Sequence, residues 1–480
     1  MAKRARLRII ALAAVVAASA WAAFALLGGE ERRPSPLVPA AGADDPFAYD
    51  PDRRGEFTRR AAAGLSHLLY AKSPGGVVAS AERVDRYREV VEDVAGETGF
   101  DPDTIEGIVL LESAGRPDAM ASDDPRGAVG LTQILAETGQ NLLKMRVDPV
   151  RSGRLTRQIA RAERRGQTER VERLRAQRRR VDERYDPVKA LAATGRYLTF
   201  AKGQLGRDDL AVASYHMGVG NLQNVVKAFG AGEDTPYAEL FFDSSPLRHA
   251  KAWAILAGLG DDSSTYLWRV EAAKDIMRRF RDDPAALEER AAAMTAKNSS
   301  EEVLHPEDDT EVYAESEAIE TAVQSGDLSP LRPAELRAGG ISIDPGMGEL
   351  APRLKQRKSL YRALQPDALA LLVYLARGTE AISKAEPLVL TSTVRDTGYQ
   401  RLLTGRNVEA TDGYSLHTTG WAFDIERTYR SRRHALAFQF MLDRLQALNL
   451  IAWVREPGAI HVTAGPEARE LRDLLRPARP

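Results

Sequence analysis

The chain has 480 residues, enough for two or three domains that each bury a core of their own. It contains no cysteine, which excludes disulfide bonds and cysteine-ligated zinc sites and leaves His, Asp and Glu as the available metal ligands. The 67 basic and 68 acidic residues leave a formal net charge of −1, which gives no case for nucleic-acid binding.

The N-terminus predicts a membrane anchor. Basic residues in MAKRARLR precede an uncharged run at 9–27, and at a rise of about 1.5 Å per residue this run spans roughly 28 Å, about one hydrocarbon core. Basic residues before the run place the rest of the chain on the extracytoplasmic, periplasmic side of the cell envelope. A signal peptide cleaved at 18–20 is the alternative, although that cut falls inside the apolar run. We assign 1–28 to an anchor or signal and 29–56, rich in proline, glycine and charge, to a flexible linker.

Apolar residues recur at three- and four-residue spacing over 57–290, which predicts an all-helical domain. The clearest helical segments are 84–99, 105–113, 188–206, 209–217 and 250–260. An arginine-rich insert at 146–185 predicts a solvated helical hairpin. Its alternative is a basic arm that touches an anionic envelope polymer or lipid headgroups.

Glu112 stands at the end of an apolar helical stripe. It follows Ile108 by four residues and Val109 by three, and Gly115 and Pro117 predict that the helix ends just after it. A carboxyl group that is buried without a fixed cation has a raised pKa, which suits a general acid. The alternative is an exposed glutamate at a helix end.

Three separated motifs in this domain resemble the lytic transglycosylase family of the lysozyme-like fold. They are ES at 112–113 with its proline loop, GAVGLTQI at 127–134, and the pair YDPVKALAATGRYL and ASYHMGVGN within 185–221. The resemblance covers about 95–230. It implies peptidoglycan as the bound polymer and cleavage between N-acetylmuramic acid and N-acetylglucosamine with a 1,6-anhydro product. Two positions depart from the family, since His216 replaces the usual asparagine and Thr132 the usual methionine.

The resemblance also implies a role for each matched residue. Glu112 protonates the leaving oxygen and then acts as base while the muramyl 6-hydroxyl closes the anhydro ring. Tyr215 orients this acid, and Ser113, Gly130 and Gln133 bind the saccharide. The reaction requires no cofactor and no second carboxylate, and the local sequence offers no obvious partner acid for the paired-carboxylate mechanisms.

The rest of the chain predicts a linker and a second domain. An acidic stretch at 291–330 shows no clear apolar period and is typical of a linker. From 331 to 480 a mixed pattern predicts a small α+β domain. Its expected helices are 366–382 and 431–448, and its expected strands are 387–393, 421–426, 450–454 and 459–463.

Two histidines and an aspartate of this second domain predict a metal site. His417 precedes the strand at 421–426, and Asp424 lies on that strand, so the two side chains can converge on one ion. His461, on a later strand, is the candidate third ligand. Two imidazoles, a carboxylate and an open position describe a catalytic zinc site, and Glu456 is the nearest candidate for the base that deprotonates the hydrolytic water. For each histidine the alternative is a satisfied, partly buried side chain.

The motif SLHTTGWAFD at 415–424 resembles the zinc D-alanyl-D-alanine peptidases, which include VanY-type carboxypeptidases. Upstream, TSTVRDTGYQRLL resembles the arginine-and-glutamine segment of that group, with Arg395 and Gln400 at the matching positions. The resemblance covers 388–465. It implies Zn²⁺ as cofactor, hydrolysis of stem-peptide bonds, and substrate binding by Arg395, Gln400 and Ser415. Carboxypeptidase and endopeptidase activity both remain open.

The two resemblances together predict a membrane-anchored, bifunctional peptidoglycan hydrolase. One departure concerns the second domain, where four residues separate Glu456 from His461 and family members usually carry Glu-x-x-His. This spacing and His216 favour the alternative of a peptidoglycan-binding scaffold with one or both sites inactive. A third interpretation keeps glycan cleavage and makes the second domain a metal-dependent structural module.

Overall fold

The computed structural model describes residues 45–232, 234–385, 387–405 and 413–475. The predicted anchor at 9–27 lies outside these residues, as does the larger part of the predicted linker at 29–56. No helix in the described ranges is both long enough and apolar enough to cross a membrane.

The chain divides into two compact units. A helical unit comprises 68–240 and 255–291. A C-terminal unit comprises the described residues up to 67, together with 241–254 and the chain from 292 onward. The helical unit is therefore an insertion within the chain of the C-terminal unit.

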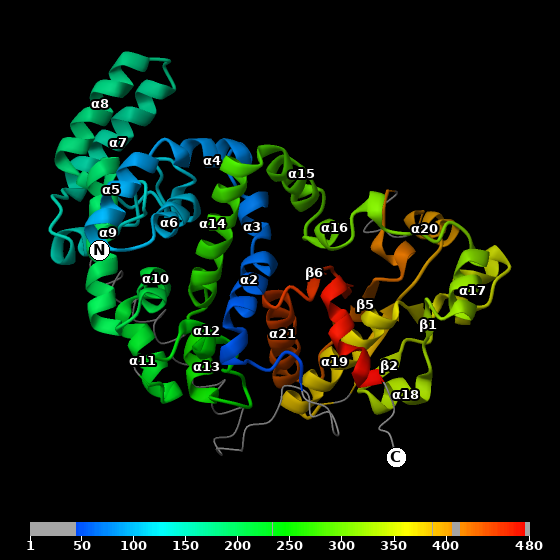
Figure 1. The fold of residues 1–480 in the computed structure, drawn as a ribbon. Helices are drawn as coiled ribbons and strands as arrows, with labels where there is room; N and C mark the ends of the chain where they lie inside the picture. Colours follow the sequence, from blue (N-terminus) through cyan, green and yellow to red (C-terminus); the bar gives the residue numbers. More distant parts are fainter. Residues whose placement is uncertain (1–44, 233, 386, 406–412, 476–480) are drawn as a thin grey trace. The chain divides into compact units, whose positions relative to one another are not determined.

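The helical unit contains no strand longer than an isolated bridge among its described residues, which fits the predicted all-helical domain (Figure 1). Its α-helices, some of which extend into the other unit, are α3 (His67–Ala71), α4 (Val77–Asp85), α5 (Arg88–Thr98), α6 (Pro102–Ser113), α7 (Pro149–Glu163), α8 (Thr168–Val181), α9 (Pro187–Leu205), α10 (Asp208–Met217), α11 (Val219–Phe229), α12 (Tyr237–Phe242), α13 (Ala250–Gly258), α14 (Tyr266–Asp282) and α15 (Pro284–Thr295). Shorter turns are η2 (Thr138–Leu142), η3 (Glu183–Tyr185) and η4 (Asp262–Thr265).

Helix α6 packs against α14, α5 and α4 in this unit. It begins at Pro102, where the carboxylate of Asp101 accepts a hydrogen bond from a backbone N–H of the first turn. Gly107 allows the close approach of the two helices, because a Cβ at this position would lie 3.0 Å from the carbonyl oxygen of Val270. The helix ends at Ser113, and the next residue, Ala114, has a left-handed φ of 53°.

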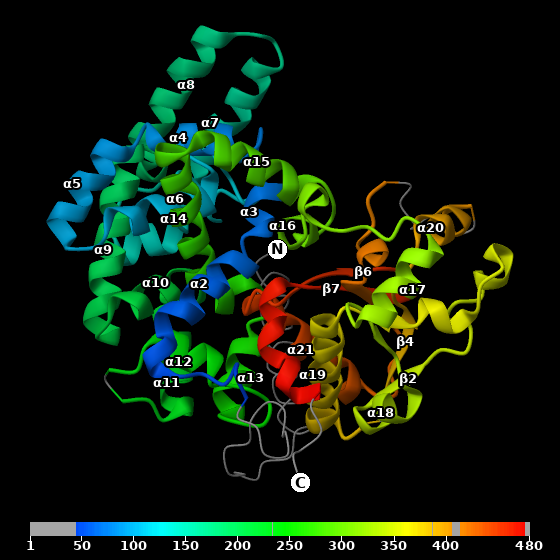
Figure 2. The same cartoon turned by 45° about the vertical axis from the view of Figure 1, so that its right-hand side comes forward.

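The arginine-rich insert forms the helical pair α7 and α8, which lie side by side (Figures 1 and 2). A small apolar core joins them, made by Ile159, Ala162, Val171 and Leu174. Most arginines of the pair are exposed, as expected for a solvated hairpin. Arg178 is an exception: it is buried, with its guanidinium 3.7 Å from the ring centroid of Tyr185.

The C-terminal unit is built on a five-stranded sheet in the order β2-β4-β5-β7-β6, in which only β2 and β4 pair in parallel. The strands, with a small second pair, are β1 (Ser329–Pro330), β2 (Ile341–Ile343), β3 (Ala363–Leu364), β4 (Leu388–Ser392), β5 (Ala422–Glu426), β6 (Ile451–Arg455) and β7 (Ala459–Ala464). Its helices and turns are η1 (Pro51–Arg53), α2 (Arg54–Gly64), α16 (Glu301–Leu304), η5 (Glu307–Asp309), α17 (Ser316–Ser325), α18 (Pro333–Ala338), η6 (Ala351–Leu354), η7 (Lys358–Tyr361), α19 (Pro366–Ser383), α20 (Thr397–Thr404), η8 (Leu416–Thr419), α21 (Arg432–Ala447) and η9 (Pro466–Leu475).

The central strand β5 determines where the functional side chains lie. It pairs antiparallel with β7, and in this register Asp424 is directly opposite His461. The helices α19 and α21 pack against each other, and their largely buried sequences explain the long apolar runs in this part of the chain (Figure 2). The sheet agrees with the predicted mixed pattern, including the expected strands on either side of the 456–458 turn.

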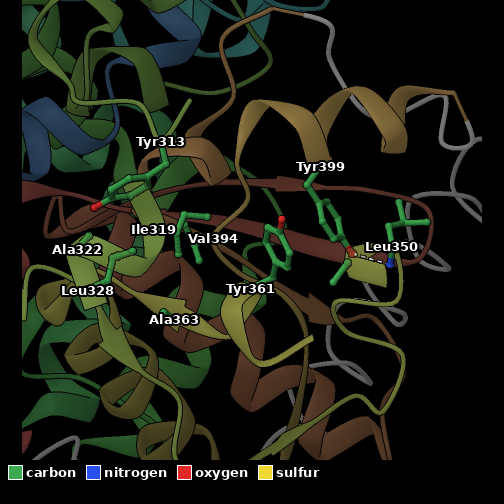
Figure 3. Close-up of a cluster of buried hydrophobic side chains, with 10 residues drawn as sticks. Tyr313, Ile319, Ala322, Leu328, Leu350, Tyr361, Ala363, Val394 and Tyr399 are labelled. Carbon is green, nitrogen blue, oxygen red and sulfur yellow. Dashed lines mark hydrogen bonds between the residues drawn. The ribbon is translucent and has the colours of Figure 1, made fainter. Parts of the chain in front are cut away.

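The acidic segment at 291–330 differs from the predicted linker, because it contains α16 and α17 and contributes to a core. Tyr313 and Ile319 from this segment pack with Tyr361, Val394 and Tyr399 of the sheet-bearing region (Figure 3). Only a few of its side chains point into this core, and most of its acidic residues other than Glu301 are exposed or half-buried, so no apolar period is visible in the sequence. The unit therefore starts before the predicted boundary at 331.

Segments from far upstream complete the same unit. Helix α2 packs against α21, and Gly64 is needed there because a Cβ would lie 1.8 Å from the carbonyl oxygen of Gln446. The buried guanidinium of Arg444 donates hydrogen bonds to the carbonyl oxygens of Phe241 (2.9 Å), Phe242 and Ser244 (2.8 Å). These contacts explain why 45–67 and 241–254 belong to the C-terminal unit.

The core role of the acidic segment can be tested by truncating one side chain. Ile319 is fully buried, so Ile319→Ala should lower the free energy of unfolding by about 2–5 kcal/mol. Leu436→Ala is the matched control, since Leu436 is 39% exposed and its loss should change stability by less than about 1 kcal/mol. Chemical denaturation of both variants measures the difference, and equal stabilities would show that the segment is a linker after all.

Candidate active site and metal centre

Glu112 lies in the last turn of α6 and is partly buried. Its Oε1 accepts a hydrogen bond of 2.7 Å from the hydroxyl of Tyr266, at the start of α14. No lysine or arginine of the described chain forms an ion pair with it, whereas Glu106 on the same helix pairs with both Arg88 and Arg281. Burial raises the pKa of Glu112 to about 7, and the hydrogen bond from Tyr266 opposes part of this rise.

A cluster of aromatic rings supports this carboxyl group. The ring of Tyr215 stacks on that of Tyr266 at a centroid distance of 6.0 Å, and Tyr197 meets Tyr215 edge-on at 5.1 Å. The hydroxyl of Tyr215, however, donates to the carbonyl oxygen of Thr132 at 2.8 Å. The hydroxyl at Glu112 is therefore that of Tyr266, and the predicted orienting residue Tyr215 reaches the acid only through this stack.

Tyr266 was not predicted, although it makes the direct contact. It lies 154 residues after Glu112, and a tyrosine in the first turn of an amphipathic helix looks like any core aromatic. His216, which departs from the family pattern, extends the same cluster: its ring stacks on Tyr266 at 5.5 Å, and its Nδ1 lies 2.7 Å from the hydroxyl of Ser263.

The loop at 127–134 is held close to the end of α6. Gly130 has a φ of 84°, and a Cβ there would lie 1.9 Å from the carbonyl oxygen of Arg184, so only glycine fits. Ser113 is buried, and its hydroxyl donates to the carbonyl oxygen of Leu131 at 2.7 Å. Gln133 donates its side-chain amide to the carbonyl oxygen of Gly130 at 2.8 Å. Ser113 and Gln133, predicted to bind saccharide, thus use these polar groups to shape the loop.

Arg184, near the C-terminal end of the arginine-rich insert, stabilises this loop by hydrogen bonds. Its fully buried guanidinium forms an ion pair of 2.8 Å with Asp182 and donates to the carbonyl oxygens of Pro125 (2.8 Å), Gly127 (2.9 Å) and Ile134 (3.1 Å). This role is not visible in the sequence, because Arg184 stands at the end of an arginine-rich run whose members are mostly exposed.

His417, Asp424 and His461 meet in the C-terminal unit, as the sequence predicted they would. Their ligand atoms lie within 4.8 Å of one another. The Oδ1 of Asp424 is 3.2 Å from Nε2 of His417 and 2.9 Å from Nδ1 of His461. All three side chains are almost fully withdrawn from solvent, and two imidazoles with one carboxylate are a donor set that zinc accepts.

The far nitrogen of each imidazole also has an acceptor. Nδ1 of His417 is 2.9 Å from the carbonyl oxygen of Thr393, and Nε2 of His461 is 3.0 Å from a carboxylate oxygen of Glu301. Metal-ligating histidines usually donate their second N–H in this way, which fixes the ring and the tautomer. The residues present therefore fit a bound metal ion.

The two histidines of the cluster differ strongly in pKa. Burial and the nearby guanidinium of Arg395 lower the pKa of His417 to about 4. Burial also favours the neutral ring of His461, but its hydrogen bonds to the carboxylates of Asp424 and Glu301 raise its pKa to about 10. The pKa of Asp424 lies well below its usual range, because the two imidazoles outweigh the effect of burial.

The predicted substrate-binding residues lie beside this cluster. The guanidinium of Arg395 donates to Oε1 of Gln400 at 3.0 Å and to Oδ2 of Asp424 at 3.3 Å. Arg395 and Asp424 line a cavity of about 600 Å³. Ser415 is buried immediately before η8, the turn that carries His417.

Glu456 lines the same cavity from the turn between β6 and β7. Its backbone N–H donates to the carbonyl oxygen of Ala459 at 3.0 Å, which closes the turn. Glu456 is not part of the three-residue group that converges on one point, so its role as base stays a prediction.

The raised pKa of Glu112 predicts how stability depends on pH. The folded pKa of about 7 lies above the ordinary value of 4.5, so the wild type loses stability as the pH rises from below 4.5 through about 7. Glu112→Gln removes this loss. Between pH 4 and pH 8 the stability of the variant relative to wild type should rise by roughly 1–3 kcal/mol, after allowance for partial exposure. Chemical denaturation at both pH values checks this, and a difference that does not change with pH would contradict the assigned pKa.

A comparison with family models matches residues 157–237 to the family described as "Transglycosylase SLT domain". The matched segment runs from within α7 to the start of α12 and contains Tyr197, Tyr215 and His216. It begins after Glu112 and ends before Tyr266. A search of curated proteins found no match. Over residues 157–237 the chain is similar to a transglycosylase SLT domain, which supports peptidoglycan lytic transglycosylase activity with peptidoglycan as substrate.

Proposed function

We propose that the chain is a bifunctional peptidoglycan hydrolase of the cell envelope. Its helical unit is a lysozyme-like domain that cleaves the glycan strand. Its C-terminal unit hydrolyses stem-peptide bonds with bound zinc. Anchoring through residues 9–27 is part of this proposal and rests on the sequence alone. The observation that carries the glycan activity is the carboxyl group of Glu112, which is held by Tyr266 and has no cationic partner in the described chain.

The glycan reaction needs an acid that is protonated near neutral pH. Protonated Glu112 donates its proton to the glycosidic oxygen as the bond from the muramyl C1 to that oxygen breaks. The resulting carboxylate then takes the proton of the muramyl 6-hydroxyl, and the oxygen of that hydroxyl bonds to C1. This closes the 1,6-anhydro ring and restores the acid form of Glu112. Tyr266 occupies Oε1, which leaves the other carboxyl oxygen for the sugar. A pKa of about 7 suits both the donation and the return of this proton.

The peptide activity rests on the donor set of the C-terminal unit and on its likeness to zinc D-alanyl-D-alanine peptidases. Nε2 of His417, Oδ1 of Asp424 and Nδ1 of His461 would hold the ion, which when bound supplies Lewis-acid activation for hydrolysis of a peptide bond. The cavity beside these residues carries Arg395, whose positive charge suits a peptide carboxylate or carbonyl oxygen. Glu456, on the same cavity, is the proposed base.

A binding role without peptide cleavage is the second candidate for the C-terminal unit. It is favoured by the position three residues before His461, where Gly458 stands and the family pattern has glutamate. In the helical unit His216 departs from the family pattern, but its ring stacks on Tyr266, whose hydroxyl keeps its hydrogen bond to Glu112. The scaffold interpretation therefore concerns mainly the second unit.

Glycan cleavage is tested by Glu112→Gln, which removes the proton donor and leaves its size unchanged. Anhydro-muropeptides released from purified sacculi should fall by at least about 100-fold, as expected when a general acid is lost. The matched control is Glu97→Gln, an exposed glutamate on α5 that should keep full activity. Wild-type activity should also fall as the pH rises above about 7, because the acid form is then depleted. Mass spectrometry of the products decides, and full activity of Glu112→Gln would disprove the assignment.

Peptide cleavage is tested by removing the metal or one ligand. Chelation and His417→Ala should each abolish peptide products from the same sacculi and spare the anhydro-sugar products, which serve as the internal control. Circular dichroism of the His417→Ala variant reports whether the unit stays folded. Loss of the fold would favour a structural metal, and peptide cleavage that persists in chelator would exclude a zinc peptidase.

A further inference from the structure

Glu301 lies behind the candidate metal site, although the sequence places it in an apparent linker. It is the first residue of α16 and is 6% exposed. One carboxylate oxygen, Oε2, is 3.0 Å from Nε2 of His461 and 3.1 Å from the hydroxyl of Thr463. Both partners are on β7, so the contact joins the acidic segment to the strand that carries a candidate ligand.

Lys297 holds the same carboxylate from the other side. Its Nζ is 2.9 Å from Oε1 of Glu301, and it also donates to the carbonyl oxygen of Tyr414 at 2.9 Å. Tyr414 directly precedes the motif that contains His417. With both carboxylate oxygens engaged, the position of Glu301 is fixed from two directions.

The contact determines which nitrogen of His461 faces the cluster. Nε2 of His461 is directed at Glu301, and Nδ1 at Oδ1 of Asp424, 2.9 Å away. A neutral imidazole that donates Nε2–H to a carboxylate carries its lone pair on Nδ1, the nitrogen that is then free to bind a metal ion. His417 has the reverse arrangement, because its Nδ1 faces the carbonyl oxygen of Thr393 and its Nε2 faces Asp424.

We propose that Glu301 is a positioning residue of the metal site, which fixes the ring and tautomer of His461 so that Nδ1 is presented to the ion. The inference rests on the proposed function only in requiring that the cluster binds a metal ion. On this proposal the acidic segment at 291–330 contributes to the metal site. Its carboxylate, that of Glu301, contacts the ligand His461 and does not contact the ion. Such partners of metal-bound histidines typically change metal affinity by 10–100-fold.

A purely structural role of Glu301 would have a different signature. The carboxylate also ties α16 to β7, so its loss lowers stability under either interpretation. Only a positioning role changes the affinity for the metal and the ligand field around it. The experiment therefore measures both, with folding monitored separately by the melting temperature in chelator.

The variants are Glu301→Ala, Glu301→Gln and the matched control Glu302→Gln in the full chain. Glu302 is the next residue and also pairs with Lys297, at 3.1 Å, but no contact joins it to His461. Zn²⁺ affinity is measured by competition with a chromophoric chelator, and Co²⁺ substitution reports the ligand field by visible absorption. Glu301→Ala should weaken Zn²⁺ binding by about 10–100-fold and change the Co²⁺ spectrum. Glu301→Gln should lose less, since its amide oxygen still accepts from Nε2, and Glu302→Gln should behave as wild type.

Three results would overturn the proposal. Wild-type Zn²⁺ affinity and Co²⁺ spectrum in both Glu301 variants would defeat it while the metal site stands. An equal loss in the Glu302→Gln control would show that only the charge or stability of the segment matters. A wild-type chain that binds neither ion would defeat this inference together with the peptidase half of the proposed function, and glycan cleavage would be unaffected.

Discussion

A charged or polar group that is withdrawn from water needs a partner, and in this chain the partners come from distant segments. Asp424 is engaged by His417, His461 and Arg395. The guanidinium of Arg184 is satisfied by backbone carbonyl oxygens of the loop beside Glu112. The contacts of Asp424 hold the strand and the turn that carry the candidate metal ligands. Those of Arg184 hold the loop beside Glu112. The shape of both candidate sites therefore depends on the partners of these two buried charged groups.

The two candidate sites shift the pKa values of their central carboxyl groups in opposite directions. Glu112 has a tyrosine hydroxyl and no cation, so burial raises its pKa to about 7 and keeps a proton available. Asp424 lies between two imidazoles and a guanidinium, and its pKa is held well below the usual range, so it stays ionised. The first environment suits the transfer of a proton, and the second suits the binding of a cation.

The sequence predicted features that depend on neighbours along the chain. Helix α6 with Glu112 at its end, the hairpin of α7 and α8, and the strands of His461 and Asp424 all follow from local periodicity and turn residues. The convergence of His417, Asp424 and His461 was also predictable, because one motif places the first two before and on a strand, and His461 lies on a later predicted strand of the same domain. Register then brought Asp424 opposite His461.

Contacts across long sequence separations were not predictable. Tyr266 reaches Glu112 over 154 residues, and Glu301 reaches His461 over 160. Both look ordinary in their local sequence: one is an aromatic residue in an amphipathic helix, and the other is one acid among many. The sequence of 291–330 resembles a linker for the same reason, since the segment adds single side chains such as Ile319 to a core formed mostly by other segments.

The discontinuous chain of the C-terminal unit has a consequence for its synthesis. Residues 45–67 emerge from the ribosome early, yet α2 packs against α21, which emerges almost last. The helical unit has all its residues by 291 and is free to fold much earlier. Until α21 has emerged, α2 lacks the helix against which it packs in the folded unit. The C-terminal unit therefore completes its core only near the end of synthesis.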